Sequence, residues 1–272
     1  PMPRWISELD QVRVAPEVWF MTHVLGDGDN YTFGGSLPSG DHFTAMVYVD
    51  HNLGTVVKDA FIVPQSLESV GESMTQRITD PDQSLSLVDP ADARAQVEAA
   101  IEHGARMLPP LETDTWPGCR PIVEWLLRQL PAGGSVPQFT EWSQQDKQSL
   151  AEDFFASRFG QGLDSEDQRS LLDSLLWFGT DYNVGGPLRW SWTNVEIVLV
   201  DWFPRKVMAP PEFLAPLPDL LRAFIRYAHD REGIRASLTE HTVTAVGRWE
   251  SEYQELIRGE SPDGPASMLA QI

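Results

Sequence analysis

The segment AMVYVDHNLGTVVKDAFIVP, residues 45–64, decides how the first part of the chain folds. Two runs rich in β-branched and aromatic residues flank the polar segment His51–Gly54, which is typical of two strands joined by a turn. The polar residues also raise a question of function. Asp50, His51 and Asn52 are common in turns, but the same residue types serve in metal sites and in acid–base chemistry.

The register of this hairpin limits what it can do by itself. We expect Asp50 to pair with Thr55 across the turn, which places Asp59 opposite Met46 and leaves the two carboxylates about 13 Å apart. That separation is too large for one metal ion or for a retaining-type carboxylate pair. The hairpin alone therefore predicts a hydrogen-bonded turn, with Asp59 paired to a neighbouring group because an acid in an apolar strand needs a partner.

The hairpin belongs to a longer β-rich stretch. Strand-like segments at 18–26 and 31–36 precede it, separated by turn residues, so residues 1–65 predict an antiparallel meander. After Pro64 the apolar period becomes helical. Asp89 and Pro90 have the residue types of a helix start. The expected inner face of that helix comprises Ala93, Val97, Ala100, Ile101, Gly104 and Leu108.

Together these patterns predict an α+β protein, with an N-terminal antiparallel β-meander and helices followed by an all-helical C-terminal half. The Gly- and Pro-rich segment 131–138 is the expected boundary. We predict an α+β domain at 1–135, a helical domain at 136–258 and a flexible tail at 259–272. Trp202 and Phe224 lie on apolar stripes and are expected to share one helical core.

Composition restricts the classes of function. The 272 residues are 42% hydrophobic, include ten Trp and carry a net charge of −20, which together predict a packed, soluble, acidic protein. This charge disfavours binding to nucleic-acid backbones and membrane surfaces. There is no secretion signal or long apolar run, so the expected location is the cytoplasm. The expected partner is a protein, and a homo-oligomer is an open alternative.

Histidines and acids of the β-rich part form the first candidate site. The residues considered for a metal ion are His23, His42, His51, Asp50 and Asp59. No histidine lies in a close metal-binding pair such as HExxH. The segment GDGDNY at 26–31 resembles the start of a calcium loop but lacks the glutamate that completes one. For each of these residues, an ordinary position in a turn or strand is therefore an alternative to binding a metal ion.

A basic group in the C-terminal half forms the second candidate site, for an anion, an acidic peptide or a nucleic-acid backbone. Its residues are Arg205, Lys206, Arg222, Arg226 and His229. The last three follow one another at helical spacing, opposite the apolar face of their helix. The alternative is an exposed face whose arginines pair with nearby acids such as Asp219 and Asp230.

The single cysteine and the missing motifs narrow the chemistry further. Because Cys119 is the only cysteine, the chain can form neither an internal disulfide nor a cysteine-based zinc cluster. The neighbouring Arg120 and a helix start are expected to lower the pKa of its thiol. The sequence has no GxxxxGK[ST], GxGxxG or GxSxG motif, which disfavours the common nucleotide-binding and hydrolase mechanisms. No cofactor is indicated.

Three segments, VYVDHNLGTVVKDAFIVP, VEIVLVDWFPRKV and LPDLLRAFIRYAHDREGI, resemble uncharacterised bacterial proteins. This resemblance implies no activity, cofactor or catalytic residue. The leading hypothesis is a non-catalytic interaction or regulatory protein. One alternative is a metal-dependent or acid–base enzyme with its site at the junction of the two halves, and another is a nucleic-acid-associated protein that uses the Arg-rich helical face.

Overall fold

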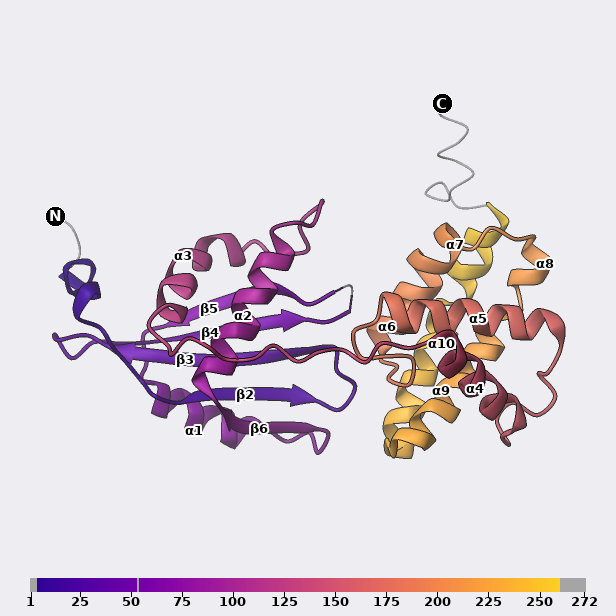
Figure 1. Ribbon diagram of the computed structural model, residues 1–272, viewed down its shortest axis with the longest axis horizontal. Helices are drawn as coiled ribbons and strands as arrows, with labels where there is room; N and C mark the ends of the chain where they lie inside the picture. The colour runs from indigo at the N-terminus through magenta and orange to yellow at the C-terminus, as the bar shows by residue number, and fades with distance from the viewer. Residues whose placement is uncertain (1–3, 53, 260–272) are drawn as a thin grey trace, which may run out of the picture. The chain divides into compact units, whose positions relative to one another are not determined.

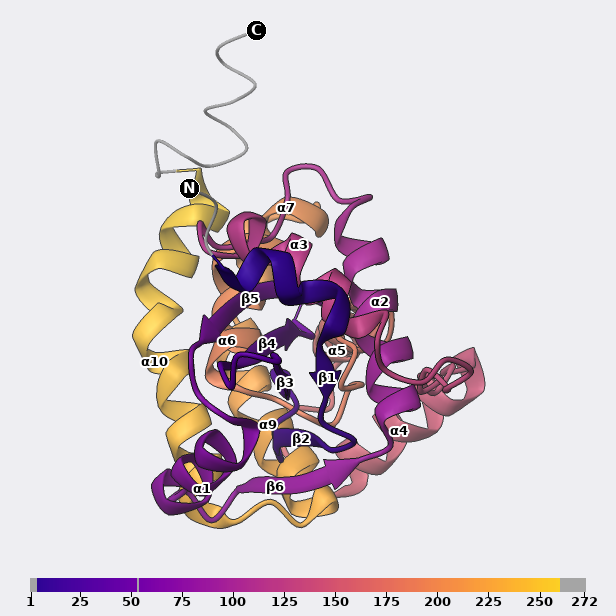
Figure 2. The ribbon, with the colours of Figure 1, turned by 90° about the vertical axis from the view of Figure 1, so that its left-hand side faces the viewer.

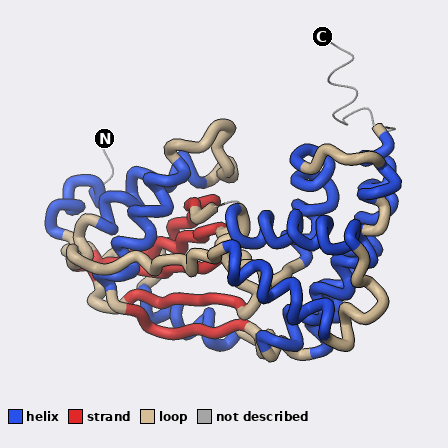
Figure 3. The backbone as a smooth tube through the Cα atoms, turned by 45° about the vertical axis from the view of Figure 1, so that its right-hand side comes forward, coloured by secondary structure: helices blue, strands red, loops and turns tan. Residues whose placement is uncertain are grey.

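The computed structural model describes residues 4–52 and 54–259, and the chain divides into two compact units, residues 1–139 and 140–272 (Figure 1). Strands occur in the first unit, and the second is built of helices (Figure 3). This arrangement confirms the predicted α+β class with a helical C-terminal half. Most of the predicted tail lies outside the described residues; Gly259, its first residue, ends the last helix with a φ of 71°.

The N-terminal unit is organised around one antiparallel sheet of six strands in the order β5-β4-β3-β2-β6, with β1 paired to β3. Its elements are η1 (Arg4–Gln11), β1 (Arg13–Val14), β2 (Val18–His23), β3 (Gly28–Ser36), β4 (His42–Asp50), β5 (Val56–Val63), α1 (Leu67–Arg77), β6 (Gln83–Val88), α2 (Pro90–Gly104) and α3 (Trp116–Leu127). The meander through β5 was predicted. Strand β6 was not, because the apolar period after Pro64 predicted only helices.

The two faces of the sheet carry different helices, because successive side chains of a strand point to opposite faces. On one face, Val18, Tyr31 and Val47 pack with buried residues of α2 and α3. On the other face, Trp19 lies against α1, where a Cβ at Gly71 would stand 2.7 Å from the indole Nε1. Figure 2 shows α1 and α2 on opposite sides of the sheet. The sheet is therefore the middle layer of its unit.

Helix α2 begins as the sequence predicts. The Asp89 side chain accepts a hydrogen bond from the Ala91 amide, and Pro90 is the first helical residue. The expected inner face is buried up to Ile101, but Leu108 is 93% exposed, so its predicted burial is wrong. The reason is that α2 ends at Gly104, one turn before Leu108, and the chain then leaves the sheet.

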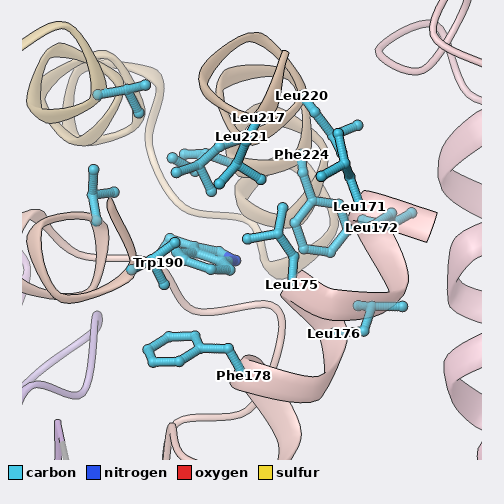
Figure 4. Close-up of a cluster of buried hydrophobic side chains, with 14 of the residues drawn as sticks. Leu171, Leu172, Leu175, Leu176, Phe178, Trp190, Leu217, Leu220, Leu221 and Phe224 are labelled. Carbon is cyan, nitrogen blue, oxygen red and sulfur yellow. The ribbon is translucent and has the colours of Figure 1, made fainter. Parts of the chain in front are cut away.

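The C-terminal unit encloses a separate apolar core. Its elements are α4 (Gln144–Ala156), α5 (Glu166–Asp181), α6 (Trp192–Glu196), the π-helix η2 (Ile197–Trp202), α7 (Phe203–Lys206), α8 (Pro211–Leu214), α9 (Leu217–Glu232) and α10 (Ala236–Arg258). Figure 4 shows Trp190 among leucines of α5 and α9, with Phe178 and Phe224 nearby. Trp202 and Phe224 are both buried in this core, as predicted.

The segment TNVEIVLVDWF is helical, as its continuous apolar character suggested, but not regularly so. Helices α6 and α7 are joined by η2 without a break. A π-helical turn accommodates one more residue than an α-helical turn. Here the adjacent residues Trp202 and Phe203 are both buried.

Candidate functional site

The five residues predicted for a metal site do not lie together. Strand β4 runs from His42, opposite Ser36, to Asp50, opposite Gly28. Its nine residues place these two ends about 26 Å apart. His42 is therefore remote from Asp50 and His51. The other four residues each have partners of their own, and those partners define what each side chain does.

Asp59 holds the segment before α3 onto β5. Its Oδ1 accepts hydrogen bonds from Thr113 Oγ1 at 2.7 Å, from the hydroxyl of Thr115, and from the Ala60 amide at 2.8 Å. The register expected for Asp59 is wrong, because it lies opposite Tyr48 and not Met46. An irregularity in the pairing after Tyr48 shifts the register between the turn and the rest of the hairpin.

The same carboxylate affects the single cysteine. Burial raises the pKa of the Cys119 thiol, and the negative charge of Asp59 raises this pKa further. The predicted lowering of this pKa by Arg120 and the helix start is therefore wrong. Arg120 instead donates to Glu124 at 2.7 Å, one turn further along α3. The Cys119 thiol therefore stays protonated and lacks the character of a nucleophile.

His23 belongs to a group that has the spacing of a metal site. Within the described residues, one set of three potential ligands has atoms within 4.8 Å of one another: His23, Asp80 and Asp82. However, the Leu25 amide donates to Nδ1 of His23 at 3.2 Å, so the neutral ring carries its proton on Nε2. That nitrogen faces Asp80 Oδ2 at 3.7 Å. His23 thus presents a proton to Asp80 and not a lone pair to a cation.

His51 is the centre of a continuous chain of hydrogen bonds. Its Nε2 lies 2.8 Å from Asp29 Oδ2, and its Nδ1 lies 3.2 Å from Thr55 Oγ1. The Asp29 carboxylate can only accept, so the neutral imidazole carries its proton on Nε2 and accepts the Thr55 proton at Nδ1. The side chains of His51 and Asp29 are each only 15% exposed. The Thr55 hydroxyl, the His51 imidazole and the Asp29 carboxylate are thus hydrogen-bonded one after another. We call this arrangement the Thr55–His51–Asp29 relay.

The strands explain why these three residues meet. Asp29 lies opposite Val49 in the β3–β4 ladder, so Asp29, Val49 and His51 share a face of the sheet. The turn then returns the chain through Gly54, which has a φ of +107°, to Thr55, the residue before β5. From the sequence, His51 was a candidate site residue, whereas Asp29 was expected only in a calcium-like loop and Thr55 only as a pairing partner of Asp50. Asp29 and His51 are 22 residues apart in sequence and become neighbours only through the β3–β4 register.

Acidic groups around the relay make its surroundings electrostatically negative. Asp50 is buried and binds Lys58 Nζ at 2.9 Å and the Asn52 amide at 2.9 Å. Burial raises the pKa of the Tyr48 hydroxyl, and the negative charges of Asp50, Asp27 and Asp29 raise it further. Tyr48 therefore stays a neutral phenol, and any ligand that binds here meets a region that repels anions.

A cavity lies where the start of β5 meets the end of α2. Its volume is about 240 Å³. The lining residues are Val57, Ala100, Ile101, Gly104, Ala105, Met107, Leu108, Pro110, Leu111, Glu112, Trp116 and Arg120. Among the lining residues, Val57 follows Thr55 by two positions, so their Cα atoms are at most about 7 Å apart.

The basic group of the helical unit is largely neutralised. Arg222 binds Asp219 and Glu250, and Arg226 binds both carboxylate oxygens of Glu240 at 3.0 and 3.1 Å. The contacts with Glu250 and Glu240 tie α9 to α10. Within this group, Arg205 likewise binds Asp201, whereas Lys206 is exposed. An anion could use Arg222 or Arg226 only by displacing carboxylates that are already in place.

His229 does not belong to the basic stripe, so its predicted placement is wrong. It is completely buried, with Nε2 at 2.9 Å from the Trp190 carbonyl oxygen and Nδ1 at 3.1 Å from Thr239 Oγ1. Burial lowers the pKa of this imidazole, although its bond to Trp190 opposes the effect. His229 is a neutral core residue because α10 covers α9 at this position.

Comparisons of the chain with protein-family models, with curated proteins and with solved structures found no match. Within the described residues, no helix has both the length and the apolar character needed to cross a bilayer. The site must accordingly be interpreted from its own geometry.

Proposed function

We propose that the N-terminal unit is an acid–base enzyme of the ester-hydrolysing or acyl-transferring type, with Thr55 as nucleophile and His51 as its general base. The observation that supports this function is the unbroken relay, with 3.2 Å from Thr55 Oγ1 to His51 Nδ1 and 2.8 Å from His51 Nε2 to Asp29. A hydroxyl becomes an effective nucleophile when an adjacent base accepts its proton, and a third group holds that base in the required tautomer.

The reaction would proceed in two steps that mirror each other. Thr55 Oγ1 forms a bond to the ester carbonyl carbon while its proton moves to His51 Nδ1. The bond to the leaving alkoxide then breaks, and the alkoxide takes this proton and departs as an alcohol. In the second step water attacks the carbonyl carbon of the acyl-threonine and gives a proton to Nδ1. The bond from that carbon to Oγ1 then breaks, Oγ1 takes the proton back from Nδ1, and the acid is released. Asp29 is a positioning residue, which accepts from Nε2 and stabilises the imidazolium.

The surroundings indicate the class of substrate. The nearby cavity has a volume of about 240 Å³ and is lined by Ile101 and Trp116 as well as by Glu112 and Arg120, so its size suits a small acyl group. The carboxylates of Asp27 and Asp50 near the relay disfavour an anionic acyl group. We therefore favour neutral esters with short aliphatic acyl chains.

The test combines a chromogenic ester with a covalent probe. Purified protein is assayed with p-nitrophenyl butyrate and separately labelled with a fluorophosphonate, and the labelled peptide is identified by mass spectrometry. We expect labelling of Thr55, retained in Thr55→Ser and lost in Thr55→Ala. His51→Gln should lower the rate by about a hundredfold or more, because it removes the base.

A matched control comes from the same unit. Thr115→Ala removes a threonine whose hydroxyl also binds a carboxylate, that of Asp59, outside the relay. Its rate and labelling should equal those of the wild-type protein. Labelling of another residue, or wild-type hydrolysis by Thr55→Ala, would show that the relay only stabilises the turn.

A further inference from the structure

Strand β6 forms one edge of the sheet and pairs within the described part of its unit with β2 alone. Its pairing with β2 is continuous over six residues, from Val18 opposite Val88 to His23 opposite Gln83, without a bulge. The second hydrogen-bonding side of β6 therefore faces away from the sheet. Figure 1 shows β6 as the outermost strand on its side.

The ladder pattern identifies the backbone groups that face outward. The Val24 amide donates to the Asp82 carbonyl oxygen at 3.0 Å, which directs the backbone of Asp82 toward β2. In an antiparallel pair this orientation alternates from residue to residue. Ser84, Ser86 and Val88 thus bond inward, whereas the amides and carbonyls of Leu85 and Leu87 point away from β2.

This edge lacks the features with which proteins block unwanted strand pairing. The sequence of β6, QSLSLV, has no charged residue and no proline, and Leu87 is 52% exposed. Charges, prolines and bulges are the usual protections. The opposite edge differs, because on β5 the Lys58 carbonyl is bonded to the Thr113 amide at 2.8 Å and α2 and α3 pack against the strand.

Charge at the two ends of β6 indicates what would bind there. Asp80 and Asp82 precede the strand, and Asp89 and Asp92 follow it. A second copy that paired Leu85 with Leu87 in two-fold antiparallel fashion would bring the acids at one end against those at the other. The net charge of −20 adds to this repulsion. A segment with basic residues at both ends would instead meet opposite charge.

We propose that β6 binds an extended segment of another protein, in which alternating apolar residues are flanked by lysine or arginine. The segment would add a strand to the sheet by bonding the outward amides and carbonyls of Leu85 and Leu87. Its apolar residues would cover Leu87, and its basic residues would lie near Asp82 and Asp89. This site is independent of the relay and would serve the regulatory or interaction role that the sequence suggested.

The experiment uses the full chain and two synthetic peptides, KRTVTVTKR and its charge-reversed form EETVTVTEE, in a fluorescence anisotropy titration. We expect the basic peptide to bind, with an affinity that falls as salt rises, and the acidic peptide not to bind. Leu87→Pro removes one outward amide and leaves the inward bonds to β2, so it should weaken binding at least tenfold. Leu87→Thr retains the amide and should bind within a few-fold of the wild-type protein.

Folding of the variants is checked by circular dichroism. Should Leu87→Pro unfold, Leu87→Lys provides a second test, because its charge repels a basic strand at the same edge. No binding of the basic peptide by the wild-type protein, or equal binding by Leu87→Lys, would overturn the proposal. A wild-type dimer that becomes monomeric in Leu87→Lys, measured by sedimentation, would overturn it in favour of a second copy.

Discussion

Replacing Trp190 and Trp202 separately by phenylalanine tests how a buried indole N–H without a partner affects the helical core. Both tryptophans are buried, and both substitutions remove the same atoms, so the loss of apolar burial largely cancels in the comparison. Trp190 Nε1 donates to the Pro187 carbonyl at 3.0 Å. Trp202 Nε1 is buried and has no hydrogen-bond partner within the described residues.

The expected difference follows from these two environments. Losing the Trp190 hydrogen bond costs about 0.5–1.5 kcal/mol, whereas removing an unsatisfied buried N–H relieves a penalty of about 1–3 kcal/mol. Trp190→Phe should therefore lower the free energy of unfolding by about 1.5–4.5 kcal/mol more than Trp202→Phe does. Most of this difference originates in the one N–H group that Trp202 buries without a partner.

The assay is urea denaturation followed by circular dichroism at helical wavelengths, with midpoints compared at an unchanged slope. Trp202→Ala serves as the control for burial itself and should cost roughly 3–5 kcal/mol. Equal losses in the two phenylalanine variants, or a larger loss in Trp202→Phe, would refute the reasoning. An unchanged midpoint in Trp202→Ala would refute the core assignment as well.

Three further outcomes are expected from the same kind of measurement. Burial holds the pKa of His229 below its usual 6.5, so as pH falls below about 6.5 the unfolded chain binds a proton that the folded chain does not. Stability should decrease there, and His229→Gln should reduce that decrease in urea titrations between about pH 5 and 7.5. Replacing Arg222 and Arg226 by alanine should cost about 0–1 kcal/mol per ion pair, and less at high salt. Gly71→Ala should lower the melting temperature clearly more than Gly118→Ala, because a Cβ at Gly71 would stand 2.7 Å from Trp19 Nε1, whereas one at Gly118 would face open space.

The parts of the fold that were predicted correctly depend on short-range signals. Asp89 and Pro90 start α2 through bonds and dihedral angles that involve only neighbouring residues. The segment QSLSLV of β6 alternates serine with leucine, which is the period of a half-buried strand, but the helical patterns on either side led to a helical prediction. The strand is completed by its pairing with β2, at least 60 residues earlier in sequence.

In the candidate site, too, local sequence signals identified single residues but not their partners from distant parts of the chain. His51 stood out because it lies in a polar turn, yet its partner Asp29 lies 22 residues away and becomes a neighbour only through the β3–β4 register. Asp59 was expected to have a hydrogen-bonding partner. Thr113 is such a partner, but it follows α2 and is 54 residues away in sequence. His229 fits the arginine stripe by spacing and is nevertheless buried, because α10 covers that position. Spacing along one helix does not reveal which neighbouring helix packs on it.

The π-helical turn at Ile197–Trp202 has a consequence for the tolerated length of the chain. Such a turn contains one residue more than the α-helical turn that would replace it, while the helices on either side keep their phase. Removal of a single half-buried residue, such as Val200, would turn Trp192–Lys206 into one regular helix and leave both ends facing the core as before. A one-residue gap between this chain and a relative at this point would thus be compatible with an unchanged helical core.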